Sequence, residues 1–140
     1  MKLPYIGAAP TRAHQDDAGL DLRAAESHKL DDVFWKFKPA MVDTGTAVDI
    51  PKGHVGLLVA RSSLCKKGLI LANGIGIIDP GYHGTIKVPL LSFKSAVEVE
   101  AGERIAQLVI VPIAQVEPVE VEEFEESERG EGGFGSTGRS

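Results

Sequence analysis

A series of short apolar or alternating runs, separated by turn signals, constrains the fold of this chain more than any other feature. The runs are rich in Val, Ile and Leu and cover Thr46–Ile50, Val55–Ala60, Thr85–Phe93, Ala96–Glu100 and Ile105–Ile113. Turn-forming sequences lie between them, namely Pro51-Lys-Gly53, Asp79-Pro-Gly81 and Ala101-Gly102. Many short strands at near-regular spacing are typical of sandwiches and barrels, so we expect an all-β domain.

One short helix is expected after the second run. Ser62 or Ser63 is a good N-cap, and Gly68 suits the position just past the helix end. The helix start would present free N–H groups beside two serine hydroxyls and Arg61, a combination that can bind an anion. An ordinary capped turn with a surface arginine is the alternative.

Charge and cysteine content limit the partners and the compartment. A formal net charge of −5 argues against a general duplex-binding surface, so no nucleic-acid partner is expected. Cys65 is the only cysteine and the N-terminus is not signal-like, which favours a cytoplasmic, intracellular protein. No apolar run approaches the roughly 20 residues of a membrane span, so no membrane partner is expected.

A carboxylate and an arginine alternate with apolar residues near the N-terminus. In the segment 16–25, a strand would bury Leu20, Leu22 and Ala24 and project Asp21 and Arg23 to the other face. A simple surface pair of Asp21 with Arg23 is the alternative.

Two further segments carry polar groups in an apolar context. The segment 72–84 combines a hairpin-turn signal at Asn73-Gly74 with a second turn at Asp79-Pro-Gly81, and a hairpin edge of this kind could read a base. Asp79 could instead be a turn cap. Gln107 interrupts an apolar strand, where its amide would need a partner such as a ligand or water, unless the strand is an edge.

The last twelve residues, 129–140, are a Gly-rich tail equipped to hold a nucleotide. Five of them are glycine, and cations, hydroxyls and the ring of Phe134 lie among these. A flexible segment of this composition suggests a lid that orders over a ligand. A P-loop is excluded, because the Gly-Lys-Ser/Thr ending is missing and no chain follows to form the helix.

An acidic run precedes the tail, from Glu117 to Glu128. Its ordinary interpretation is a solvated connector. Ordering the roughly 25 residues from Val116 to the last residue without a partner is costly, so this stretch is either disordered or docked on another surface. Val119, Val121 and Phe124 could form a docking strand, and that surface could belong to a neighbouring subunit.

The five polar segments occur in an order that resembles the homotrimeric dUTPases over nearly the whole chain. The matching segments are Ala18–Arg23, Arg61–Leu64 with Ser63 where Gly is more usual, Asn73–Gly84, Gly102–Leu108 and Arg129–Gly138. The resemblance implies a jelly-roll-like β-barrel, or β-clip, with one short helix and a C-terminal arm exchanged between subunits. It also implies one β-domain over 1–128, including the docking strand, and a flexible active-site lid over 129–140.

The resemblance implies hydrolysis of dUTP to dUMP and pyrophosphate by attack of water on the α-phosphate. Such an enzyme limits uracil in DNA and supplies dUMP for thymidylate synthesis. Asp79 would be the general base, and Mg²⁺ would be the cofactor, with Asp21 touching a metal-bound water. Active sites would be shared among three subunits of a homotrimer.

The resemblance also assigns the substrate-binding residues. Arg61, Ser62 and Arg129 would contact phosphates, Tyr82 would lie under the deoxyribose, and Phe134 would stack on uracil. The full set is Arg61, Ser62, Ser63, Asn73, Ile77, Ile78, Tyr82, Lys87, Gln107, Arg129, Phe134, Gly135, Ser136 and Thr137.

Two rival interpretations fit parts of the sequence. A dCTP deaminase shares the Arg61-Ser-Ser-Leu and Ile78-Asp-Pro-Gly patterns, but the glutamate that such enzymes use for proton transfer aligns with Pro89. A non-catalytic binding module could instead use the segment 28–38, which contains Phe34, Trp35 and Phe37, or the acidic run before the tail. The ordinary interpretation of Trp35 is packing on its own barrel.

Overall fold

The structure is a computed structural model that describes residues 1–31 and 38–133, and most of its regular structure is β-strand. Its single helix in the described residues is short, and its strands are mostly three to nine residues long. In chain order the elements are β1 (Tyr5–Gly7), β2 (Leu20–Arg23), β3 (His28–Leu30), β4 (Ala40–Val48), β5 (His54–Val59), α1 (Ser62–Lys66), β6 (Leu69–Leu71), β7 (Gly76–Ile78), β8 (Thr85–Ser92), β9 (Val97–Val99) and β10 (Arg104–Pro112).

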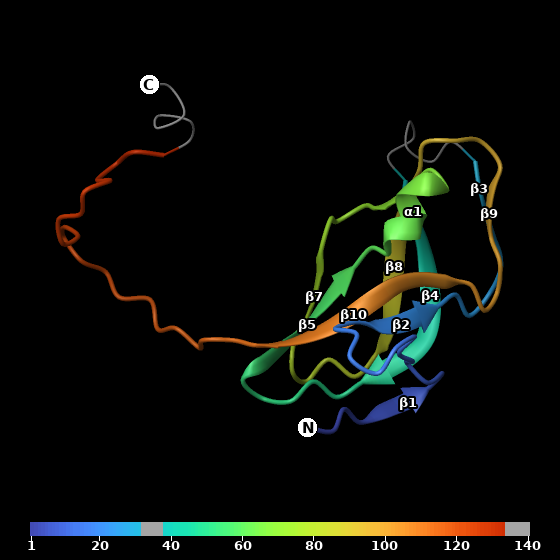
Figure 1. Ribbon diagram of the computed structural model, residues 1–140, viewed down its shortest axis with the longest axis horizontal. Coiled ribbons are helices and arrows are strands. Elements are labelled where there is room, and N and C mark those ends of the chain that lie inside the picture. Colours follow the sequence, from blue (N-terminus) through green and yellow to red (C-terminus); the bar gives the residue numbers. More distant parts are fainter. Residues whose placement is uncertain (32–37, 134–140) are drawn as a thin grey trace.

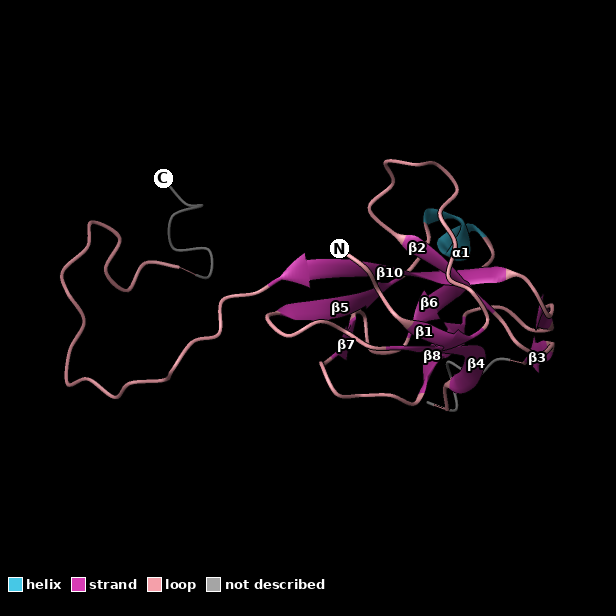
Figure 2. Ribbon diagram, turned by 90° about the horizontal axis from the view of Figure 1, so that it is seen from below, coloured by secondary structure: helices cyan, strands magenta, loops and turns pink. Residues whose placement is uncertain are grey.

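The strands form two four-stranded antiparallel sheets and one small two-stranded sheet (Figures 1 and 2). The first sheet has the order β1–β4–β8–β6, and the second has the order β2–β10–β5–β7. Strands β3 and β9 pair with each other at one end. This arrangement confirms the expected all-β class with one short helix.

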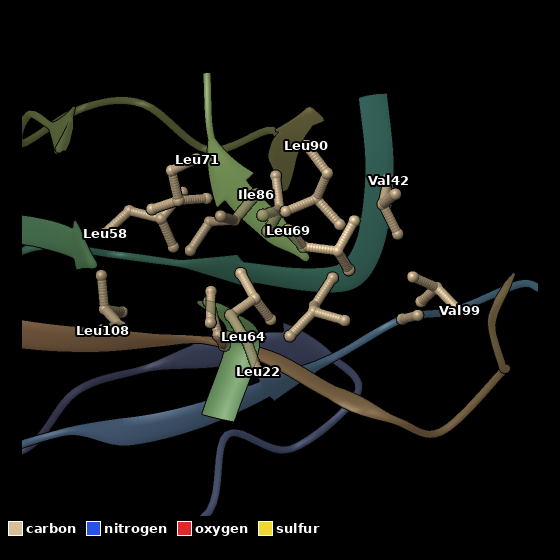
Figure 3. Close-up of a cluster of buried hydrophobic side chains, with 14 of the residues drawn as sticks. Leu22, Val42, Leu58, Leu64, Leu69, Leu71, Ile86, Leu90, Val99 and Leu108 are labelled. Carbon is tan, nitrogen blue, oxygen red and sulfur yellow. The ribbon is translucent and has the colours of Figure 1, made fainter. Parts of the chain in front are cut away.

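The core lies between the two four-stranded sheets (Figure 3). Val42, Val88 and Leu90 of the first sheet are fully buried, and they face Leu58 and Leu108 of the second. Each such side chain stabilises the fold by about 1.5–3 kcal/mol through removal of its apolar surface from water. Buried and exposed residues alternate along these strands, so every second side chain points outward, and polar side chains gather on that outer face.

Four of the five expected runs match strands to within two residues. The remaining run, Thr46–Ile50, covers only the end of its strand. Strand β4 begins at Ala40, six residues before the expected start at Thr46. Asp43 and Gly45 interrupt the apolar pattern of this strand. The strand is irregular there, since a register shift lies between Asp43 and Ala47 and Gly45 adopts a φ of +67°. The Asp43 carboxylate accepts hydrogen bonds from the Gly45 amide at 2.8 Å and the Thr85 hydroxyl at 3.1 Å, which satisfies it inside the strand.

The helix forms where expected but begins one residue early. Arg61, and neither Ser62 nor Ser63, is its N-cap, because the Arg61 carbonyl already accepts a bond from the Leu64 amide at 2.9 Å. Both serines therefore lie in the first turn, with exposed side chains. Gly68 follows the helix with a φ of +85°, as its expected position required. Leu64 anchors the helix in the core.

Beyond β10 the chain leads away from the sheets (Figure 1). Residues 113–133 contain no strand, and Val119, Val121 and Phe124 are 72%, 54% and 88% exposed. The docking strand therefore stays a prediction that needs a second surface. Within residues 1–31 and 38–133, no helix has the length and apolar character required to cross a membrane.

Candidate active site

The polar face of the second sheet is built where β2, β10 and β5 lie side by side. Gln107 of β10 pairs with Asp21 of β2 and with Val59 of β5, and directly opposed residues share a face. The neighbours of Gln107 along the strand, Ala106 and Leu108, are fully buried in the core. The alternation of β10 thus aims Gln107 outward beside Asp21.

Asp21 lies on the outer face but is only 7% exposed, because two arginines cover it. Its Oδ1 lies 3.3 Å from Nε of Arg61, and its Oδ2 lies 3.5 Å from Nη1 of Arg104. The expected pair with Arg23 does not form, since the Arg23 guanidinium donates to the Gly102 carbonyl at 2.9 Å. The buried face expected for this strand is confirmed by Leu22 and by Ala24, which follows it.

Arg61 and its neighbours place donors beside this carboxylate. Nη1 of Arg61 donates to Oγ of Ser63 at 3.5 Å, while its Nε faces Asp21. The Ser62 side chain is exposed, and its carbonyl accepts a hydrogen bond from Sγ of Cys65 at 3.3 Å. The Arg61 side chain is 24% exposed, so its planar fork can still reach an anion such as phosphate.

A cleft of about 400 Å³ joins these groups. It is lined by Ala13, Asp17, Ala18, Gly19, Asp21, Val59, Arg61, Ser62, Gln107 and Val109. Gly19 leaves room for the Gln107 amide, because a β-carbon on it would lie 2.3 Å from Oε1 of Gln107. Gln107 is not an edge residue, since β10 lies inside its sheet, and its Nε2 donates to the Ala60 carbonyl at 3.5 Å.

The segment 72–84 has the expected turns but is not a hairpin. Gly74 adopts a φ of +72° in a turn closed by the Leu71 carbonyl, yet β6 pairs with β8 while β7 pairs with β5. The turn therefore connects the two sheets, which sequence alone could not show, because partner choice depends on the whole fold. Ile77 is 59% exposed, Ile78 is half-buried against the core, and Asn73 is exposed.

Asp79 follows β7 and is exposed. Within the described residues its carboxylate makes no hydrogen bond or ion pair, so it is not a side-chain turn cap. Its carbonyl accepts a bond from the Tyr82 amide at 3.3 Å. The hydroxyl of Tyr82 donates to the Thr85 carbonyl at 2.9 Å, and its ring lies over Gly84, where a β-carbon would be 2.6 Å from the hydroxyl oxygen.

One chain does not bring Asp79 to the cleft. Asp79 follows Ile78, which pairs with Gly56 of β5, whereas Gln107 pairs with Val59 near the other end of that strand. At about 3.3 Å per residue, the strand separates the two positions by on the order of 10 Å. The structure thus brings Asp21, Arg61, Ser62, Ser63 and Gln107 together and leaves Asp79 and Tyr82 apart.

The remaining expected residues also lie away from the cleft. Lys87 is exposed on β8 of the first sheet, opposite Asp43. Arg129 lies on the extended C-terminal segment, where its Nε donates to the Gly132 carbonyl. Phe134, Gly135, Ser136 and Thr137 lie outside the described residues, as do Phe34, Trp35 and Phe37.

Arg104 is a site residue that the sequence pattern alone did not indicate. Arg104 was part of the fourth polar segment, but no role was assigned to it, although it is one of the two arginines on Asp21. The signal that could have found it is the apolar pair Ile105-Ala106, which interrupts the alternation of the strand. In residues 1–31 and 38–133 no group of three or more His, Cys, Asp or Glu side chains could hold a metal ion alone.

Comparison with known proteins gives a consistent result. A family model described as dUTPase matches residues 7–138. Deoxyuridine 5′-triphosphate nucleotidohydrolase of Escherichia phage T5 is 43% identical over 125 residues, which cover 80% of this chain and 78% of the relative. The protein of that name from Mycobacterium tuberculosis is 44% identical over 111 residues, covering 77% and 70% of the two chains.

Solved structures show the same similarity. The dUTPase of Staphylococcus bacteriophage 80alpha, determined with dUpNHpp, superposes with a TM-score of 0.84 at 37% identity over 96% of this chain and 97% of that one. A mutant dUTPase from phage phi11 of S. aureus, described with a coordinated structural Mg(II) ion, superposes with a TM-score of 0.76 at 31% identity over 90% and 100%.

Proposed function

This chain belongs to the dUTPase family, and from that premise we propose how its own residues carry out the reaction. The protein hydrolyses dUTP to dUMP and pyrophosphate on a jelly-roll-like β-fold. The observation that carries the assignment of roles is the contrast between two carboxylates. Asp21 is buried between arginines in a cleft, and Asp79 is exposed without a partner among the described residues.

The active site is shared between copies of the chain in a homotrimer. The separation of Asp79 from the Asp21 cleft supports this proposal, because the two carboxylates of a single chain lie too far apart to act on the same phosphate. Cyclic symmetry lets a surface of one copy complete the cleft of the next. Residues 1–128 form the β-domain with its docking strand, and the exposed apolar side chains of the segment 113–128 favour an arm that crosses to a neighbour.

Asp79 is the general base. Its carboxylate is exposed and has no partner among residues 1–31 and 38–133, so it can accept a proton from a water that attacks the α-phosphorus in line, provided that the water lies within hydrogen-bond reach. A positioned base of this kind contributes about 10²–10⁴-fold to the rate. Gln107, anchored on the Ala60 carbonyl, helps to place that water or a phosphate oxygen.

Donors of the cleft bind the triphosphate. Arg61 offers a planar fork at the rim, and Arg129 offers a second fork from the tail. The Ser62 hydroxyl donates to oxygens at the α–β link, where negative charge develops on the leaving group. The Ser63 hydroxyl accepts a hydrogen bond from Arg61 and helps to orient it, and Lys87, exposed on β8, is a further substrate-binding cation.

The residues present fit Mg²⁺ held mainly by the nucleotide. Both oxygens of Asp21 already face arginines, and the described chain offers no set of three ligands, so a dedicated protein cage is not available. Asp21 would contact the ion through a bound water, which agrees with the preference of Mg²⁺ for few protein ligands. When bound, Mg²⁺ shields the charge of the triphosphate and fixes its conformation.

The segment 72–84 selects the base and the sugar. Backbone groups near Asn73, Ile77 and Ile78 pair with uracil, and a pocket closed over C5 excludes the methyl group of thymine. Tyr82, held by its bond to the Thr85 carbonyl, lies under the deoxyribose. The lid 129–140 then closes, Phe134 stacks on uracil, and Gly135, Ser136 and Thr137 contact the phosphates.

Pyrophosphate release from dUTP, dTTP, dCTP and UTP, with and without Mg²⁺, tests the substrate and metal assignments. We expect rapid release from dUTP only, and only with Mg²⁺. Equal turnover of dTTP or UTP would contradict the role given to the segment 72–84. Ammonia released from dCTP would indicate a deaminase, although Pro89 of β8 has no group that can transfer a proton.

Subunit complementation tests the shared site. Asp79→Asn and Arg61→Gln are each expected to be inactive alone. Subunits of the two variants, unfolded together in equal amounts and refolded, should regain about a quarter of wild-type activity, because that fraction of sites draws both intact residues from different subunits. The two variants refolded separately and mixed afterwards are the control. Absence of any recovery after co-refolding would place both residues of a site in one chain.

A further inference from the structure

Strand β10 is irregular next to the cleft. Ile105 and Ala106 are consecutive residues and both are 0% exposed, so the alternation of faces fails between them. The pairing with β2 shows the same irregularity, because the register shifts between Arg104 and Ala106. An extra residue of this kind is a β-bulge, which turns the preceding side chains to the opposite face.

The bulge decides where Arg104 points. Gln107 faces the cleft, so regular alternation would also turn residue 105 to the cleft and residue 104 toward the core. With the bulge, Ile105 enters the core and Arg104 emerges on the cleft face, where its Nη1 lies 3.5 Å from Oδ2 of Asp21. The irregularity therefore delivers a cation to a carboxylate that is almost buried.

The contact of Arg104 with Asp21 becomes most important when Arg61 leaves Asp21. Arg61 faces Oδ1 of Asp21 in this structure, but the proposed function requires its fork to reach the triphosphate. A carboxylate with an exposed fraction of only 7% would then lose one of its two charged partners. Arg104 occupies the other oxygen, so Asp21 keeps one cation throughout.

We propose that Arg104 is a positioning residue that the bulge in β10 aims at Asp21, so that this carboxylate stays paired and oriented while Arg61 transfers to the phosphates. This inference rests on the proposed function, since it assigns the exchange of partners to substrate binding. Arg104 itself does not need to touch the nucleotide.

The chain supplies a matched control for a mutational test. Arg23 lies on the same outer face and is the registered partner of Arg104 across β2 and β10, but its guanidinium donates to the Gly102 carbonyl. Arg104→Gln and Arg23→Gln therefore remove the same charge from neighbouring positions. Only the first removes a partner of Asp21.

Steady-state dUTP hydrolysis and calorimetric binding of dUpNHpp with Mg²⁺ measure the effect. Arg104→Gln should lower kcat/KM and weaken dUpNHpp binding by about 10–100-fold, the range seen when partners that orient a metal-site residue are lost. Arg104→Lys should recover most of the loss, and Arg23→Gln should stay within about twofold of wild type. In an Asp21→Asn background, Arg104→Gln should have little further effect on either quantity, because the interaction is already gone.

Several outcomes would overturn the proposal. These are unchanged kinetics and binding in Arg104→Gln, equal losses in Arg23→Gln, or a loss that persists undiminished in the Asp21→Asn background. Circular dichroism and gel filtration establish folding, and Arg104→Met, which keeps the apolar stem, carries the same expectation if Arg104→Gln does not fold. Asp79→Asn, measured in parallel, separates failure of the proposed function from failure of the role of Arg104. If Asp79→Asn abolishes turnover while Arg104→Gln leaves turnover unchanged, only the role of Arg104 is refuted.

Discussion

Asp21 and Asp79 are chemically the same side chain in two opposite settings. Asp21 sits on a strand inside a sheet, 7% exposed, with an arginine nitrogen at 3.3 and 3.5 Å from its two oxygens. Asp79 sits on a turn after β7, exposed, with no partner for its carboxylate in the described chain. A carboxylate with both oxygens held serves to orient other groups, whereas a free one can take up a proton.

The difference in burial between the two aspartates also predicts that one contributes to stability and the other to activity. A nearly buried carboxylate with charged partners contributes to the folded state, and its loss leaves two cations without their counter-charge. An exposed and unpaired carboxylate contributes little to folding, so it can be retained for chemistry alone. Each prediction below challenges one side of this contrast.

The largest effect is expected for Asp79→Asn. Loss of the base should lower kcat by about 10²–10⁴-fold, while dUpNHpp binding should change little. Pyrophosphate release and calorimetry measure the two quantities, and the melting temperature should match wild type. Turnover that remained at the wild-type level would remove the base role from Asp79.

Deletion of residues 129–140 tests whether the site that contains the two carboxylates is active without the lid. We expect kcat/KM for dUTP to fall by at least about tenfold, because the lid excludes water and completes the phosphate contacts. Gel filtration should show an unchanged oligomer, since the segment 113–128 remains. Normal turnover by the truncated protein would refute the lid.

A stability difference is expected between the two aspartates. Asp21→Asn should lower the free energy of unfolding by about 1–2 kcal/mol, a value reduced from the buried-pair range because Arg61 and Arg104 are 24% and 40% exposed. Asp79→Asn should change it by less than about 0.5 kcal/mol. Chemical denaturation at one fixed protein concentration measures both, and equal losses would erase the contrast.

The smallest effect is expected for Gly19→Ala. The new β-carbon would lie 2.3 Å from Oε1 of Gln107, so the amide must turn away from its place beside Asp21. We expect a few-fold loss in kcat/KM with a change in stability of less than about 1 kcal/mol. In a Gln107→Ala background the substitution should be nearly neutral, and an undiminished loss there would show that Gly19 acts by another route.

The sequence predicts strands well where one face is uniformly apolar, as in β5, β8 and β10. It fails for β4, because Asp43 and Gly45 break the pattern and their bulge is stabilised by Thr85, which is distant in the chain. It also fails for the expected hairpin after Asn73, because β6 and β7 choose partners in different sheets. Local signals identify a turn, but they do not say which strands it joins.

Site residues divide in the same way. Asp21, Arg61, Ser62 and Gln107 were predicted together and lie in one cleft. Arg104 was missed because its direction depends on a bulge, which is a property of the paired strands rather than of the arginine. The roles of Asp79 and of the lid residues stay predictions, because the proposed site needs neighbouring copies of the chain to bring these residues to the cleft.

The bulge in β10 makes chain length a constraint alongside residue identity. An in-frame deletion of the codon for Ile105 would restore regular alternation with Arg104 still on the cleft face. It would, however, remove a fully buried side chain from the core and leave the chain one residue short before this strand. Among homologous genes we therefore expect gaps to accumulate in the connecting loops and to be purged from this short stretch of strand.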